Sequence, residues 1–333
     1  MSMFRPTFGA AVAALCLVSL PPAFAQASQT IVTVVKIAGL PWFNRMEDGV
    51  KAFAVSAPGT TTRQVGPAQA DPAAQVQLLE GLLTQKIDAL AIVPTDPGSI
   101  EDVAARAMAQ GIVVVTHEAD NLRHTHANIE AVDNATFGAA LNERMARCMG
   151  RAGQWTSFVG TRGSRTHQQW ADGGAANARR HPRMVLVEPM TESNDDADTA
   201  YTQARAILKK YPDIKGFQGA ASSDVIGIGR AIEEAGLQGK TCVFGTGLPS
   251  RTHQLLASGA VKGIGFWDPR DAGMAMNRVA RLLLDKQPIT DGMDLGVPGY
   301  RRVKVSKGPG GGWLIVGNAG VIATRDTYRK HPI

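Results

Sequence analysis

Cysteine is scarce in this sequence, which has three among its 333 residues. A fold with so few cysteines is not held by a disulfide framework and depends on a hydrophobic core instead. Cys16 lies near the N-terminus, which leaves Cys148 and Cys242 as a pair. In an oxidising compartment these two can form one disulfide; otherwise they are two small buried apolar side chains. The sequence leaves both readings open.

Beyond its first residues, the sequence also lacks any apolar run near the roughly 20 residues that a membrane-spanning helix needs. Arg5 precedes a shorter apolar stretch over residues 8–20, and the small-residue pattern Ala23-Phe24-Ala25 follows it. This arrangement is typical of a secretory signal peptide. We therefore expect residues 1–25 to be a cleaved signal peptide and the mature protein to be exported. Cys16 lies inside the apolar stretch rather than at a lipidation site, so we expect no lipid anchor.

The basic residues are in excess but do not gather in one place. The formal net charge is +6 and the sequence pI is about 9.3. No basic patch interleaved with aromatic residues and no helix-turn-helix pattern is present, which argues against a nucleic-acid partner. We interpret the charge as a contribution to solubility. Hydrophobic residues make up 44% of the chain and charged residues 19%, which is typical of a folded globular protein. Its length predicts two domains.

Short β-branched runs alternate with amphipathic helical patterns from Ile31 onward, and the series starts again in the second half. The sequence predicts strands over residues 31–37, 61–65, 89–93, 112–116, 157–159, 184–187, 216–218, 242–245 and 261–265. It predicts helices over residues 41–56, 71–85, 166–181, 196–211, 223–235 and 249–258, and one after Asp96-Pro97. Strands joined by helical crossovers form a parallel sheet covered on both faces. The expected fold class is therefore α/β, with two doubly wound parallel-sheet lobes.

Polar and aromatic residues follow the predicted strands in both units. In open parallel sheets a ligand binds beyond the carboxyl ends of the strands, because loops and helix N-termini converge there. The candidate ligand-binding residues at these positions are Lys36, Trp42, Phe43, Asp96, His117, Glu118, Asp120, His167, Gln168, Trp170, Ala220, Ser222, Asp224, Trp267 and Asp268.

This mixture of side chains suits a sugar or another polyol. Carboxylates, amides and lysine make charge-assisted hydrogen bonds to hydroxyl groups, and aromatic faces cover the C–H side of the ligand. Each position also has a purely structural interpretation. Trp42 and Phe43 suit a hydrophobic cap on their helix, Lys36 suits a solvated charge, and Asp96 before Pro97 suits a helix N-cap.

No catalytic motif is present. The sequence has no GxSxG elbow and no P-loop lysine motif, and Gly227, Gly229 and Gly236 lie within or after a helical pattern where no dinucleotide loop forms. We therefore expect no enzyme activity and no cofactor.

Metal binding is not expected either. His117 and Glu118 do not form an HExxH motif, because Asn121 stands where the second histidine is required. Asp195, Asp196 and Asp198 lack the spacing of a calcium loop, and we expect them to cap a helix.

Four segments of the sequence resemble a known family. They are VVKIAGLPWFNRMEDGVKAF, GPAQADPAAQVQLLEGLLTQKIDALAIVPTDP, GIVVVTHEAD and GFWDPRDAG. Together they resemble the type I, ribose-binding-like periplasmic sugar-binding proteins of ABC transporters, and more narrowly the branch of the autoinducer-2-binding and rhamnose-binding proteins. The likeness runs from about residue 30 to the C-terminus.

The resemblance implies a ligand site built from part of the candidate set. Its members are Lys36, Trp42, Phe43, Glu118 with Asp120 nearby, His167, Gln168, the backbone of Ala220 to Ser222, and Trp267 with Asp268. In the autoinducer-2 receptors the positions of Glu118 and His167 are usually aspartate. The longer acid and the imidazole of this chain favour a different small polyol, a pentose, a tetrose or a deoxyhexose.

The resemblance also implies how the chain divides into lobes. Residues 27–131 and 267–297 would form the N-terminal lobe, and residues 132–266 and 298–333 the C-terminal lobe, with a three-segment hinge between them. Cys148 and Cys242 would then lie at the same end of one lobe, away from the hinge.

The partners implied are a small polyhydroxylated ligand, an ABC transporter permease in the inner membrane and a chemoreceptor. We expect a monomer in the periplasm. Two alternatives belong to other classes: an exported sugar-modifying enzyme that uses Glu118 and Asp120, and the effector domain of a sugar-responsive regulator. The signal peptide argues against the regulator, and no carboxylate pair of known separation supports the enzyme.

Overall fold

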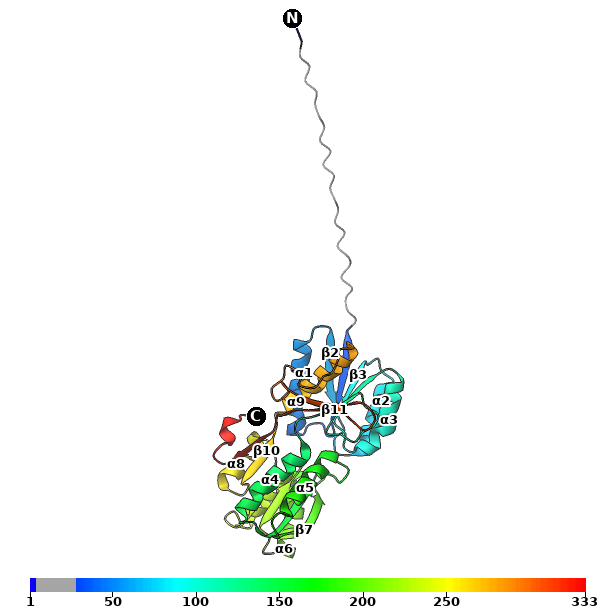
Figure 1. Cartoon of the computed structure of the whole chain (residues 1–333). Coiled ribbons are helices and arrows are strands. Elements are labelled where there is room, and N and C mark those ends of the chain that lie inside the picture. The colour runs from blue at the N-terminus through cyan, green and yellow to red at the C-terminus, as the bar shows by residue number, and fades with distance from the viewer. Residues whose placement is uncertain (4–27) are drawn as a thin grey trace.

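The computed structural model describes residues 1–3 and 28–333, which form two α/β lobes (Figure 1). The predicted signal peptide falls almost entirely on residues 4–27, outside the described residues. Among the residues that are described, no helix has the length and apolar character needed to cross a membrane.

The first lobe is built on a seven-stranded sheet with the order β11-β12-β5-β4-β3-β1-β2. Its strands are β1 (Gln29–Val34), β2 (Thr60–Val65), β3 (Ala89–Ile92), β4 (Val113–His117), β5 (Ala127–Glu130), β11 (Lys304–Lys307) and β12 (Trp313–Val316). Its helices are α1 (Pro41–Ser56), α2 (Pro72–Leu83), α3 (Pro97–Ala109) and α9 (Pro269–Leu284). The α1–α9 pair and the α2–α3 pair pack as two separate layers. The strands are parallel except for the β11–β12 hairpin.

The second lobe repeats the plan with a six-stranded sheet in the order β13-β10-β9-β8-β6-β7. Its strands are β6 (Ala152–Val159), β7 (Arg183–Glu192), β8 (Gly216–Gly219), β9 (Cys242–Thr246), β10 (Gly263–Phe266) and β13 (Val321–Thr324). Its helices are α4 (Asn134–Cys148), α5 (Arg165–Ala178), α6 (Ala197–Lys210), α7 (Asp224–Glu234) and α8 (Pro249–Ser258), followed by a 3-10 turn over Tyr328–Lys330. Only β13 runs antiparallel to its neighbour. The two sheets confirm the predicted fold class.

The chain crosses between the lobes three times. The first crossing leads from β5 to α4 and the second from β10 to α9. The third differs from the expected position at residue 297, because β11 and β12 hydrogen-bond into the first sheet and only β13 joins the second. It therefore lies between Val316 and Val321, where the Ala319 N–H donates to the Ala131 carbonyl beside the first crossing.

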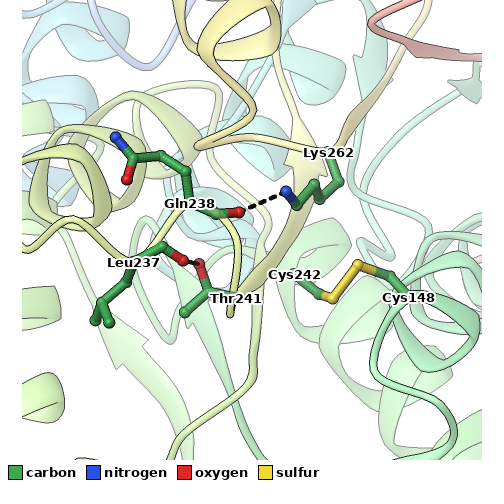
Figure 2. Close-up of a disulfide and its surroundings, with 6 residues drawn as sticks. All are labelled: Cys148, Leu237, Gln238, Thr241, Cys242 and Lys262. Carbon is green, nitrogen blue, oxygen red and sulfur yellow. Dashed lines mark hydrogen bonds between the residues drawn. A yellow bond between two sulfur atoms is a disulfide. The ribbon is translucent and has the colours of Figure 1, made fainter.

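The structure contains a disulfide between Cys148 and Cys242, with Cα atoms 5.9 Å apart (Figure 2). It ties the end of α4 to the start of β9 within the second lobe. A crosslink between residues 94 apart stabilises a fold by about 4 to 5 kcal/mol in the chain-entropy model. Of the two readings that the sequence left open, the structure supports the disulfide.

Aromatic side chains of both lobes meet where the lobes join. Trp267 follows β10 at the second crossing and is fully buried. Its ring lies 5.2 Å from that of Trp42 in the first lobe, and 5.6 and 5.9 Å from those of Trp170 and Phe137 in the second. These edge-to-face contacts form an apolar floor beneath the cleft.

Candidate functional site

A pocket lies between the lobes, at the carboxyl ends of the strands of both sheets. It has an empty volume of about 290 Å³. Charged, hydroxyl and aromatic side chains enclose it, and such a mixture is usual for a small-molecule site. Its lining residues are Lys36, Leu40, Trp42, Phe43 and Glu118 from the first lobe, and His167, Trp170, Asp195, Ala220, Ser222 and Thr246 from the second.

A buried ion pair forms the first lobe's polar contribution. Lys36 Nζ lies 3.3 Å from Glu118 Oε2, and both side chains are almost completely buried. Burial lowers the pKa of Lys36, but the attraction of Glu118 and Asp195 outweighs it, and the net result is a raised pKa. Lys36 is therefore an ammonium at neutral pH. Glu118 has a φ of 63°, a left-handed conformation that is uncommon for a residue other than glycine and is often found at functional sites.

Asp195 brings a second carboxylate to the pocket, and its expected role as a helix cap is wrong. The neighbouring Asp196 caps α6 by accepting a hydrogen bond from the Thr199 N–H at 2.7 Å. Asp195 Oδ2 is buried and has no hydrogen-bond partner among the described residues. Burial raises the pKa of Asp195, although Lys36 opposes this. A Cβ at Gly160 would lie 2.3 Å from Oδ2, so this glycine provides the space for the carboxylate.

His167 lies in the pocket as a neutral donor. The Gly160 N–H donates to His167 Nδ1 at 3.0 Å, so this nitrogen carries a lone pair. The proton of the neutral ring is then on Nε2. Burial lowers the pKa of His167 well below its usual value, and the nearby Lys36 lowers it further. The imidazole therefore offers an N–H donor without adding a positive charge.

Many of the residues expected from the sequence line this pocket together. They are Lys36, Trp42, Phe43, Glu118, His167, Trp170, Ala220 and Ser222. The others, Asp96, His117, Asp120, Gln168, Asp224, Trp267 and Asp268, do not line it.

Asp120 connects the lobes instead of facing the pocket. Its Oδ1 accepts from Arg165 Nε at 2.8 Å and its Oδ2 from Gln169 Nε2 at 2.6 Å, and both partners lie on α5 of the second lobe. Each carboxylate oxygen already has a charged or polar donor. Asp120 therefore links the first lobe to α5 of the second.

Asp96 and Asp268 are helix N-caps of the first lobe. Asp96 accepts from the Gly98 N–H at the start of α3. Asp268 accepts from the Arg270 N–H at the start of α9 and also pairs with Arg45 through two hydrogen bonds of 2.9 and 2.7 Å. Both carboxylates are therefore occupied by the protein itself.

His117, Trp267 and Asp224 lie beneath the pocket as its support. His117 Nδ1 is 2.5 Å from the Ile129 carbonyl, and the ring stands edge-on to Trp267. Asp224 accepts from the backbone N–H groups of Ala220 and Ala221, which fixes the loop that lines the pocket. Burial raises the pKa of Asp224 to about 7.

The side chain of Gln168 makes a local contact outside the pocket. Its amide donates to the Arg162 carbonyl in the loop before α5. The residues that the candidate set missed are Leu40, Asp195 and Thr246. Thr246 directly follows the predicted strand over residues 242–245, so the strand-end rule does place it at this edge of the sheet.

The fold and the pocket define a two-lobed protein with a small-molecule pocket between its lobes. The chain belongs to the periplasmic binding protein domain family, whose model matches residues 31–288. This family is made up of solute-binding proteins and not of enzymes, so the chain is a solute-binding protein.

Relatives and solved structures agree with this assignment. The chain is 24% identical over 259 residues to the D-allose-binding periplasmic protein of Escherichia coli K12. The aligned region covers 75% of this chain and 82% of the relative. It superposes with a TM-score of 0.84, at 20% identity, on a solute-binding protein from Clostridium phytofermentas with bound L-rhamnose, over 92% of this chain and 98% of the other. It superposes on LsrB from Clostridium saccharobutylicum in complex with AI-2 with a TM-score of 0.83, at 18% identity, over 91% of this chain and 100% of the other. At these identities the structural likeness establishes the fold.

Proposed function

We propose that this protein captures one small polyhydroxylated solute, a monosaccharide or a related polyol, in the pocket between its lobes. One observation carries the proposal. Asp195 Oδ2 and Thr246 Oγ1 are buried in the pocket wall and have no hydrogen-bond partner among the described residues. An unpaired buried polar group costs about 1 to 3 kcal/mol, so a ligand that supplies hydroxyl groups is strongly favoured there. Trp42, Phe43 and Trp170 offer apolar faces for the C–H side of such a ligand.

The names of the relatives support a sugar. They include proteins that bind D-allose, or D-ribose and D-allose, and structures with L-rhamnose or D-arabinose. Glu118 and His167 stand where the autoinducer-2 receptors are expected to have aspartates. We therefore favour a pentose, a tetrose or a deoxyhexose over autoinducer-2.

We propose a closing mechanism in which the ligand joins the lobes. Lys36 and Glu118 come from the first lobe, and His167, Asp195 and Ser222 from the second. A ligand that bonds to both sets binds the closed form more tightly than the open form and so shifts the population toward it. Asp120 would assist closure through Arg165 and Gln169 rather than by touching the ligand.

The sheets support a revised division of the chain. We assign residues 28–131 and 267–316 to the N-terminal lobe, and residues 132–266 and 317–333 to the C-terminal lobe, because β11 and β12 belong to the first sheet.

The biological setting follows from the family. We propose that residues 1–25 direct export, and that the mature monomer works in the periplasm and delivers its ligand to an ABC transporter permease in the inner membrane. A chemoreceptor is a second candidate partner. The disulfide within the second lobe is compatible with an oxidising compartment.

A thermal-shift panel tests the proposed function. The mature protein is melted alone and with D-allose, D-ribose, D-arabinose, L-rhamnose, several polyols and autoinducer-2, and each hit is confirmed by calorimetry. At 100 times its dissociation constant a true ligand adds about 2.7 kcal/mol of stability. The expected result is saturation at one ligand per chain without product formation. If no member of the panel raises the melting temperature, the sugar assignment is wrong.

A further inference from the structure

A second cavity adjoins the pocket on one side of the cleft. It has an empty volume of about 580 Å³. Leu40, Trp42, Asp195 and Ser222 line both spaces, so the inner pocket and this outer cavity are neighbours with a shared wall. The outer cavity is otherwise lined by Pro41 of the first lobe and by Asp196, Ala197, Ser223, Ile226, Leu248 and Arg251 of the second.

The other side of the cleft is closed by direct contacts between the lobes. Asp120 is bound by Arg165 and Gln169 across the gap. Close by, a Cβ at Gly163 would lie 3.0 Å from the Cβ of Asp96, so the two lobes touch there without space for a ligand atom. A solute in the inner pocket that is longer than the pocket has space to extend toward the outer cavity, on the side of α1 and α6.

The walls of the outer cavity combine apolar side chains with a few polar groups. Leu40, Pro41, Ile226 and Leu248 supply apolar surface on both sides. Ser223 Oγ is buried and has no hydrogen-bond partner among the described residues. Arg251 is exposed at the rim, and its guanidinium forms no ion pair within the part of the chain that the structure describes. Apolar sides with a few polar groups at the edge are the usual lining of a ligand site.

We propose that the outer cavity is a second subsite, which holds the ring-sized aglycone of a glycoside whose sugar unit occupies the inner pocket. The inference rests on the proposed function and extends it, because it makes the preferred solute a substituted sugar. The anomeric oxygen is where sugars most often carry substituents, so the glycosidic bond would pass between Trp42 and Asp195, which line both spaces.

Calorimetry with matched ligands tests the subsite. The probes are D-allose, D-ribose and L-rhamnose, each beside its methyl glycoside and both anomers of its phenyl glycoside. For a sugar that binds, we expect one phenyl glycoside to bind at least threefold more tightly than the free sugar, with the methyl glycoside in between. If every phenyl glycoside of a bound sugar binds more than tenfold more weakly than the free sugar, the subsite does not exist.

Variants that fill the outer cavity separate the two proposals. Ile226→Trp is expected to weaken the phenyl glycoside at least tenfold while changing the free-sugar affinity less than threefold. Arg251→Trp, at the exposed rim, gives the same test if Ile226→Trp lowers the melting temperature. Val185→Trp, on an exposed strand position of the same lobe, is the matched control and changes neither affinity.

The outcomes are distinguishable. Equal losses for the free sugar and the glycoside in both cavity variants would overturn the subsite and leave the proposed function intact. A protein that binds none of the free sugars and none of the glycosides would overturn both.

Discussion

The first lobe presents a charge to the pocket that is already paired, whereas the second lobe presents polar groups that still lack partners. Lys36 and Glu118 of the first lobe hold each other at 3.3 Å. In the second lobe, Asp195 Oδ2 and Thr246 Oγ1 have no partner among the described residues, and His167 Nε2 carries a proton for donation. The comparison indicates that the first lobe sets the electrostatics of the pocket, and that the second lobe gains most when a ligand arrives.

Removing the charge of Lys36 should have the largest effect. In Lys36→Met, Glu118 and Asp195 remain as buried carboxylates without their cation. Loss of one partner of a buried pair costs about 3 to 5 kcal/mol. We expect the free energy of unfolding to fall by about that amount and the ligand affinity to fall at least 100-fold, measured by denaturant melts and calorimetry.

The matched control for this change is Lys51→Met. Lys51 lies on the exposed side of α1 and pairs with Glu47 at 2.8 Å in solvent. Such surface pairs contribute about 0 to 1 kcal/mol. An affinity for Lys36→Met within threefold of the wild type would show that the buried pair does not organise the pocket.

Breaking the disulfide should affect stability strongly and binding little. The double variant Cys148→Ala/Cys242→Ala removes a crosslink that lies in the second lobe and outside the pocket lining. We expect the free energy of unfolding to fall by about 2 to 5 kcal/mol. The dissociation constant at 20 °C should stay within twofold of the wild type. A large loss of affinity in a variant that is still folded would mean that the lobe's far end controls the pocket.

Neutralising Asp195 should affect ligand binding strongly and stability little, the reverse of the effect expected for the disulfide. The folded state holds this carboxyl with a raised pKa, so its ionised form destabilises the empty protein at neutral pH. Asp195→Asn should therefore leave the melting temperature unchanged or raise it, while the ligand affinity falls about tenfold.

Asp196→Ala provides the contrast, because Asp196 caps α6. Loss of a cap costs about 1 kcal/mol of stability. The free sugar should bind this variant as it binds the wild type. If Asp196→Ala rather than Asp195→Asn impaired binding, the roles assigned to these neighbours would be exchanged.

The pH dependence of stability tests the crossing between the lobes. Glu130 at the end of β5 is buried, and burial raises its pKa to about 8. Hydrogen bonds from Asn128 and Asn134 lower this pKa, whereas the negative charges of Glu118 and Asp120 raise it further. Between its unfolded pKa near 4.5 and about 8, the folded state binds one proton more than the unfolded state. The contribution of Glu130 is therefore fully present below pH 4.5 and is lost as the pH rises to 8.

Denaturant melts of the empty protein at pH 5.5 and 8.5 measure this effect. We expect lower stability at pH 8.5, and a smaller difference in Glu130→Gln, which keeps a neutral side chain of the same shape. Asp224, whose pKa is raised to about 7, adds a change of the same sign at lower pH and remains in both proteins. An unchanged pH profile in Glu130→Gln would mean that Glu130 is ionised in the folded state.

Local pattern was enough to predict the fold and part of the site. The predicted helices over 41–56 and 249–258 coincide with α1 and α8, because proline begins each and the apolar spacing is regular. Lys36 and Glu118 follow buried strands, and the rule for parallel sheets placed them correctly at the pocket.

Contacts between distant residues decided what the sequence could not predict. Asp120 and Asp268 looked like free ligand contacts, but Arg165 and Arg45 occupy them from 45 and 223 positions away. Asp195 was predicted to cap a helix together with its neighbours. The sequence does not reveal its left-handed backbone conformation, with a φ of 54°. β5, β11, β12 and β13 were missed as short strands, and sheet pairing rather than local propensity forms them.

A crystal structure of the mature protein with the sugar that gives the largest thermal shift is the most direct test. We expect one sugar between the lobes, with hydroxyl groups within hydrogen-bond distance of Lys36 or Glu118 on one side and of His167 Nε2 and Asp195 on the other. A sugar held by one lobe alone, or in the groove by the hinge lined by Asp133 and Arg301, would contradict the account.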